Sequence, residues 1–160
     1  MFDAASQRSL PSDRAAVARI VHDLVLAVVQ RQTPAGVSVV IEGAAGIGKT
    51  FMVRKILASV GPGAAKVLHL AGEQGRRNDP FGVAGQLLAR PLLGGRPADG
   101  DPGEVAFDHV DELCADGPVV LCVDDAHYLD AASLTLWPCH SELAPPSPLI
   151  RLHLGAGGAG

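Results

Sequence analysis

One short stretch of the chain combines the residue types that bind a phosphate chain. Its pattern, G-x-x-x-x-G-K-[ST], is matched at every fixed position by Gly43, Ala44, Ala45, Gly46, Ile47, Gly48, Lys49 and Thr50. Glycines permit a tight turn whose N–H groups converge on phosphate oxygens, and a following helix adds its positive N-terminal end. In such a loop the lysine reaches the β- and γ-phosphates, and the Thr50 hydroxyl is a ligand for Mg²⁺. The stretch therefore predicts binding of a nucleoside triphosphate with Mg²⁺, and we expect ATP.

A pair of adjacent carboxylates follows an apolar run later in the chain. Val119–Val123 has the composition of a buried strand, and Asp124 and Asp125 come directly after it. Carboxylates at the C-terminal edge of a parallel sheet face the ligand crevice. We therefore predict that Asp124 holds Mg²⁺, usually through water, as the acidic partner of Thr50. The simpler interpretation, in which Asp-Asp only begins a turn, is less favoured beside a complete phosphate-binding loop.

Hydrolysis is a separate question from binding. Asp125 is a candidate for orienting or deprotonating an attacking water, and the lysine of such loops contacts the γ-phosphate. Asp125 and Lys49 are therefore the candidate catalytic residues. A hydrolase more often carries glutamate at the position of Asp125, so slow hydrolysis of ATP and binding without turnover both stay open.

The elements that must position these residues alternate between strands and helices. Short aliphatic runs predict strands over residues 37–41, 66–70, 119–123 and 149–154. Helical spacing and capping signals predict helices over residues 12–31, 49–60 and 104–115, from Pro80 onward, and after an N-cap at Asp130. The phosphate-binding loop thus lies between a strand and a helix, which is the context that the motif requires. The alternation predicts an α/β fold, a three-layer P-loop NTPase core with a mostly parallel sheet.

We expect the chain to divide into parts of unequal structure. Residues 1–36 form an N-terminal helical segment, and residues 37–154 form the P-loop ATP-binding core. Residues 155–160 are expected to be a disordered Gly/Ala tail, because they offer little side chain to pack in a core. The chain stops where such a fold normally continues, so we expect the core to be incomplete at its C-terminus.

Composition narrows the class of protein. Hydrophobic residues make up 48% of the 160 residues and charged residues 19%, which is typical of a globular chain. The formal net charge of -4 provides no general attraction for nucleic acid or an anionic membrane, so we expect neither partner. No segment approaches the run of about 18 apolar residues that spans a bilayer. The N-terminus lacks a secretion signal and the 3 cysteines form no CxxC pair, so we predict a cytoplasmic protein.

Two other groups of reactive residues have the types found in a hydrolytic triad and in a metal site, but the sequence favours neither. Asp124, His127 and Ser133 lack the G-x-S-x-G turn expected around a hydrolytic serine. Cys139-His140 lacks a second ligand pair at zinc spacing. His127 itself follows the aspartates closely, so a place near the γ-phosphate and a place at a helix edge both stay open.

Segments along most of the chain together resemble one family. VVLCVDDAHYLDAASLTL (residues 119–136) resembles the Walker B region of the LuxR-type large ATP-binding transcriptional regulators, and EGAAGIGKT (42–50) resembles their Walker A motif. DPFGVAGQLLARPLL (79–93) is similar to the stretch between these motifs. The regulators belong to the signal-transduction ATPases with numerous domains (STAND), within the AAA+-like P-loop class. The matches occur in the right order and span about residues 37–137.

The resemblance implies properties that the motifs alone do not. It implies a parallel sheet in which the P-loop strand and the Walker B strand flank a later strand. Lys49 and Thr50 take the Walker A roles, Asp124 the magnesium role and Asp125 the second acidic position. In that family ATP binding acts mainly as a conformational switch, and a separate C-terminal domain binds DNA. Ser12–Ala15 is a degraded version of the family's Gly-Arg-Glu-like element, which helps recognise adenine.

Two functions from different classes follow. The first is a Mg²⁺-ATP-binding module that acts as the nucleotide switch of a LuxR-type regulator but lacks its DNA-binding domain. The second is a non-enzymatic remnant or interaction module that self-associates or binds protein partners. The second draws on the missing C-terminal part of the core, because an incomplete sheet exposes apolar surface and an open edge.

Overall fold

The computed structural model describes residues 13–32, 37–80, 82–83, 85–86, 102–136 and 149–156. Helices and strands alternate along this part of the chain, as the sequence predicts. The elements in order are α1 (Arg14–Val29), β1 (Val37–Gly43), α2 (Lys49–Val60), β2 (Lys66–Ala71), the 3-10 turn η2 (Gln74–Arg76), α4 (Pro102–Asp116), β3 (Val119–Asp124), the 3-10 turn η3 (Ala126–Tyr128), α5 (Ala131–Leu136) and β4 (Leu149–Ala156).

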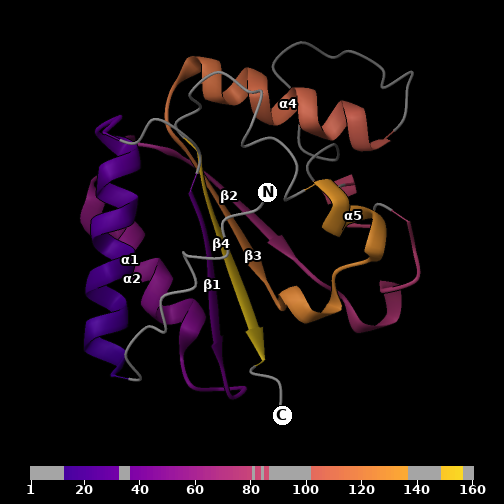
Figure 1. Cartoon of the computed structure of the whole chain (residues 1–160), viewed down its shortest axis with the longest axis horizontal. Helices are drawn as coiled ribbons and strands as arrows, with labels where there is room; N and C mark the ends of the chain where they lie inside the picture. The colour runs from indigo at the N-terminus through magenta and orange to yellow at the C-terminus, as the bar shows by residue number, and fades with distance from the viewer. Residues whose placement is uncertain are drawn as a thin grey trace, which may run out of the picture.

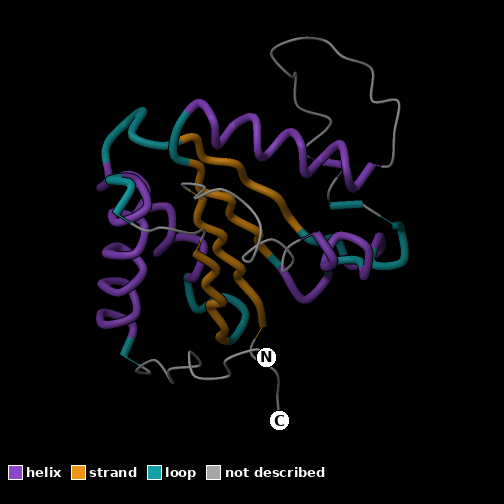
Figure 2. The backbone as a smooth tube through the Cα atoms, turned by 45° about the horizontal axis from the view of Figure 1, so that its top comes forward, coloured by secondary structure: helices purple, strands orange, loops and turns teal. Residues whose placement is uncertain are grey.

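The strands form one 4-stranded sheet in the order β1-β4-β3-β2, and every neighbouring pair is parallel. The last strand of the described chain therefore lies between β1, which leads into the phosphate-binding loop, and β3, which leads into the paired aspartates. The resemblance implied this placement of a later strand between the P-loop strand and the Walker B strand. Helices cover both faces of the sheet, with α1 and α2 on one side and α4, with α5 near it, on the other (Figures 1 and 2). The predicted three-layer α/β fold is confirmed.

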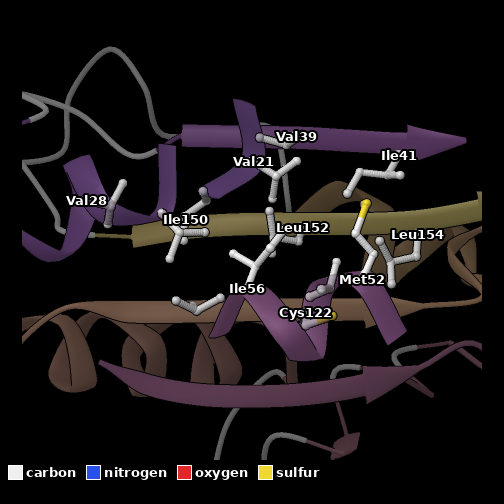
Figure 3. Packing of buried hydrophobic residues seen from close by; sticks show 13 residues of the cluster. Val21, Val28, Val39, Ile41, Met52, Ile56, Cys122, Ile150, Leu152 and Leu154 are labelled. Carbon is white, nitrogen blue, oxygen red and sulfur yellow. The ribbon is translucent and has the colours of Figure 1, made fainter. Parts of the chain in front are cut away.

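The first core lies between the sheet and the helices α1 and α2. Asp13 caps α1 by accepting a hydrogen bond from the N–H of Ala15 at 3.0 Å. Helical spacing then places Val21, Val25 and Val28 on one face of α1, where all are fully buried. Figure 3 shows side chains of α1 and α2 packing against those of β4. The buried residues of β4 in this core are Ile150, Leu152 and Leu154.

The second core lies on the opposite face of the sheet, over β2 and β3. There Leu70 and Leu121 pack against Ala106 and Val110 of α4. On β4, alternation turns Arg151 and His153 toward this face instead. Burial of His153, and then the charge of Arg151, lowers the pKa of the histidine, which therefore stays neutral at neutral pH.

The C-terminal end of the core differs from the prediction. We expected β4 to end at Leu154, but the strand continues through Gly155 and Ala156, which pair with Glu42 and Gly43 of β1. Sheet pairing uses backbone N–H and C=O groups, so residues without large side chains can extend a strand beside a formed neighbour. The rest of the predicted tail lies outside the described residues.

Other predictions fall partly outside the described chain. Of the helix expected from Pro80 onward, the structure describes a turn at residues 82–83 and helical backbone at residues 85–86. Cys139 and His140 are not among the described residues. No described helix is both long enough and apolar enough to cross a membrane.

Candidate nucleotide-binding site

The predicted phosphate-binding loop connects β1 to α2 at the C-terminal edge of the sheet. Its backbone enters the left-handed region at Gly46 (φ 77°) and Gly48 (φ 89°), where a side chain would be strained. A Cβ on Gly48 would also lie 2.8 Å from a guanidinium nitrogen of Arg14. Helix α2 begins at Lys49, directly after this turn. The glycines therefore bring the unpaired N–H groups of a helix N-terminus to the mouth of the loop.

The Lys49 side chain lies across the loop. Its ammonium group donates hydrogen bonds to the carbonyl oxygens of Gly43 at 2.7 Å and Ala44 at 2.9 Å. These two carbonyls hold the charge at the loop without burying it fully. A cation held beside converging N–H groups makes a binding site for an anion with several negative charges.

The hydroxyl of Thr50 and the carboxylate of Asp124 meet across the sheet. The Thr50 hydroxyl donates a hydrogen bond to Oδ2 of Asp124 at 2.6 Å, and the backbone N–H of Asp125 donates to Oδ1 at 3.0 Å. Hydroxyl and carboxylate oxygens are ligands that Mg²⁺ accepts, and Mg²⁺ usually takes only one or two protein ligands besides waters and phosphate oxygens. Among the described residues, no group of 3 or more His, Cys, Asp and Glu forms a metal cage. The donor set therefore fits a magnesium ion shared with a polyphosphate.

The turn after β3 holds Asp125 in an uncommon conformation. Its φ is 49°, in the left-handed region that Asp tolerates better than most residues, and its side chain is exposed. The carbonyl of Asp125 accepts a hydrogen bond from the N–H of Tyr128 at 2.9 Å. Asp125 therefore lies at the same edge of the sheet as Asp124, with a carboxylate that faces solvent. Its predicted part in hydrolysis stays a prediction.

Comparisons with known proteins identify the family to which this domain belongs. The family model of the AAA ATPase domain matches residues 14–152. The chain belongs to this family. No curated protein sequence matches the chain.

Solved structures with this fold include two ORC structures. A structure of Drosophila ORC bound to DNA has a TM-score of 0.61 and 19% identity, over 92% of this chain and 39% of that chain. A structure of the Aeropyrum pernix ORC2 protein, in ADPNP-ADP complexes, has a TM-score of 0.61 and 16% identity, over 97% of this chain and 44% of that chain. At these identities the likeness establishes the fold, and this AAA ATPase domain spans less than half the length of either chain.

Contacts that the sequence did not reveal complete the site of this AAA ATPase domain. Arg14, at the start of α1, donates to the carbonyl of Gly48 at 3.4 Å, so the N-terminal helix touches the phosphate-binding loop. Gly72, after β2, donates its N–H to the carbonyl of Asp124 at 2.9 Å. A Cβ on Gly72 would collide with the carbonyl oxygen of Asp125 and lie 3.1 Å from Cβ of Tyr128. The one available signal for this close approach was a glycine two residues after the strand predicted over residues 66–70.

The other residues with reactive or charged side chains make contacts of their own outside the phosphate-binding loop. The Ser133 hydroxyl donates to Asp130 at 2.7 Å, and Asp130 accepts the N–H of Ser133 at 2.8 Å as the predicted N-cap of α5. The buried Ser133 hydroxyl is therefore engaged with the cap of α5. Arg76 forms an ion pair with Asp79 at 3.2 Å on the surface. His127 lies in η3, and its Nδ1 accepts a hydrogen bond from the N–H of Ala156 at 3.2 Å.

Proposed function

We propose that this chain binds Mg²⁺-ATP through residues 43–50, with Thr50 and Asp124 as the protein groups that hold the magnesium ion. The observation that carries the proposal is the 2.6 Å contact between the Thr50 hydroxyl and the Asp124 carboxylate beside a glycine-rich loop. Lys49 would contact the β- and γ-phosphates, and bound Mg²⁺ would supply neutralisation of the phosphate charge. Membership of the AAA ATPase domain family supports this proposal, as does the adenine nucleotide in the Aeropyrum pernix structure.

A titration with ATP, with and without Mg²⁺, tests the site. Lys49→Ala removes the ammonium group, and a charge-assisted contact of this kind corresponds to about a tenfold to hundredfold change in affinity. Lys55→Ala is the matched control, because Lys55 is exposed on the same helix and lies over the ring of Phe51, 5.4 Å from its centre. Equal affinity of the Lys49→Ala and Lys55→Ala variants would reject the site.

We further propose that the module works as the cytoplasmic nucleotide switch of a LuxR-type STAND regulator, with slow hydrolysis at most. The resemblance of residues 42–50 and 119–136 to the Walker motifs of those regulators supports this assignment. The net charge of -4 argues against direct nucleic-acid binding by this chain. A phosphate-release assay with and without Mg²⁺ separates the possibilities. Binding with slow or absent release supports a switch, and rapid multiple turnover would reject it in favour of an efficient ATPase.

A second candidate function is association with a protein partner or with a second copy of the chain. The observation that favours it is Val40, which is 61% exposed on β1 at one edge of the described sheet. Exposed apolar groups beside an open strand edge promote pairing with another chain. Light scattering tests association with a second copy, because a monodisperse monomer without nucleotide argues against self-association.

A further inference from the structure

The two central strands of the sheet part at the candidate site. The pairing of β3 with β4 ends at Val123 and His153, whereas the pairing of β1 with β4 continues to Gly43 and Ala156. The end of β4 therefore stays paired with the end of β1, where the phosphate-binding loop begins, and is no longer paired with the end of β3, which carries Asp124. In open α/β sheets, ligands bind in the crevice outside the carboxyl ends of the strands, and this divergence lies at those ends. A contact across the divergence would fix the two halves of the site relative to each other.

His127 supplies that contact. It follows the paired aspartates in η3, and its Nδ1 accepts a hydrogen bond from the N–H of Ala156 at 3.2 Å. The ring also lies against Tyr128, with centroids 4.0 Å apart and planes inclined at 46°. Because Nδ1 accepts this hydrogen bond, the neutral ring carries its own proton on Nε2. The bond therefore selects one tautomer and one orientation of the ring.

The turn after β3 that carries Asp124 and Asp125, here called the aspartate turn, is thus held from both strands next to β3, which are β2 and β4. On the side of β2, the Gly72 N–H donates to the carbonyl of Asp124 at 2.9 Å. On the side of β4, His127 accepts from Ala156, which is the register partner of Gly43. The carbonyl of Gly43 in turn accepts the hydrogen bond of Lys49 at 2.7 Å. Each half of the site is therefore connected to the other through the end of β4.

We propose that His127 is a positioning residue that ties the aspartate turn to the end of β4 and so sets the separation between Asp124 and the phosphate-binding loop. The proposal rests on the proposed Mg²⁺-ATP site. Magnesium demands near-ideal octahedral geometry with oxygen ligands at about 2.0–2.1 Å, so a small shift of Asp124 relative to Thr50 weakens its binding. The nucleotide without metal contacts the loop and does not require Asp124. Loss of the His127 contact therefore lowers the Mg²⁺-dependent part of the affinity.

Three variants separate the hydrogen bond from the bulk of the ring. His127→Asn places Oδ1 at the same number of bonds from the backbone as Nδ1, so it keeps an acceptor for the Ala156 N–H. His127→Gln is also polar, but its acceptor lies one bond farther out. His127→Ala removes the acceptor and the ring together. If His127→Ala fails to fold, the comparison of the Asn and Gln variants carries the test.

The measurement is the ratio of ATP affinities with and without Mg²⁺, alongside thermal unfolding of each variant. Loss of one hydrogen bond to a backbone group corresponds to about a fivefold change. We expect the ratio to fall about fivefold in His127→Gln and His127→Ala and to be restored in His127→Asn. A role in stability alone would lower the unfolding temperature and leave the ratio unchanged.

The outcomes distinguish this inference from the function on which it rests. If the parent chain shows no effect of Mg²⁺ on ATP affinity, the proposed site and the role of His127 are both rejected. If the parent responds to Mg²⁺ and all His127 variants respond equally, only the role of His127 is rejected. An equal loss in the Asn and Gln variants also rejects it, because the retained acceptor would then have no effect.

Discussion

The hydroxyl of Thr50 lies 2.6 Å from the carboxylate of Asp124, a residue 74 positions later in the chain. The bond joins the first turn of α2 to the end of β3, and β4 lies between the strands that lead to these two residues. Both side chains are partly buried, so the sheet holds them together where water competes less than at the surface. Because the two proposed oxygen ligands are already in contact, binding of a metal ion would require less reorganisation of the site.

Replacement of Thr50 by valine tests the metal role of this pair. Valine preserves the branched shape but removes the hydroxyl, and a hydrogen bond to a charged group corresponds to about a tenfold to hundredfold change in affinity. We expect Thr50→Val to lose most of the gain in ATP affinity that Mg²⁺ gives, and Thr50→Ser to keep it. Calorimetric titrations at matched nucleotide concentrations measure this gain. A valine variant with the full response to Mg²⁺ would contradict the assignment.

Gly72→Ala should disturb the aspartate turn from the neighbouring strand β2. A Cβ at this position would collide with the carbonyl oxygen of Asp125, and overpacking of this kind costs about 1–3 kcal/mol. We expect a lower free energy of unfolding in denaturant and a weaker response of ATP affinity to Mg²⁺. Gly75→Ala is the control, because a Cβ there meets nothing within 4 Å. Equal behaviour of the two alanine variants would show that the turn tolerates the added group.

Asp125→Asn isolates the carboxylate from its backbone. Asparagine tolerates the left-handed conformation that Asp125 adopts at φ 49°, so the turn should persist while the negative charge is lost. If Asp125 acts as the general base, phosphate release at saturating ATP falls by about a hundredfold or more, and ATP affinity changes little. A steady-state phosphate assay measures the rate. An unchanged rate in a parent chain that hydrolyses ATP would remove Asp125 from the catalytic residues.

Local patterns in the sequence were sufficient to predict the scaffold of the site. The glycine-rich loop between a strand and a helix identified α2 from Lys49 to Val60 with both ends in place. The apolar run before Asp124 identified β3, whose first five residues are all buried. Such features depend on residues close together in the chain. The placement of β4 between β1 and β3 came from the resemblance, since periodicity says nothing of which strands are neighbours.

Contacts between distant segments could not be predicted in this way. Arg14 reaches Gly48, Gly72 approaches Asp125, and His127 accepts from Ala156, each through the packing of separate elements. The tail prediction failed at Gly155 and Ala156 for the same reason. Their small side chains favour disorder in isolation, but the neighbouring strand β1 supplies backbone partners for both.

The buried cysteines Cys114 and Cys122 provide a test of the packing on the two faces of the sheet. Burial raises the pKa of the Cys114 and Cys122 thiols to about 11. The thiolate is the reactive form, so at pH 8 only about one thiol in a thousand is reactive, and both are also shielded from reagent. In a Cys139→Ser background, which removes the remaining cysteine of the sequence, we expect slow labelling by iodoacetamide at pH 8. Denaturant should restore rapid labelling of both thiols.

The same shift fixes the sign of a pH effect on stability. The unfolded thiol deprotonates near its usual value of 9.0, whereas the folded thiol does so near 11. The stabilising contribution is therefore complete below pH 9 and is lost as the pH rises toward 11. The free energy of unfolding of the parent should fall more steeply over this range than that of Cys122→Ala, which has no thiol at that position. Parallel pH profiles for the two chains, or rapid labelling of Cys122 in the folded Cys139→Ser chain, would show that Cys122 is accessible to water and that α2 packs less closely on the sheet than the structure indicates.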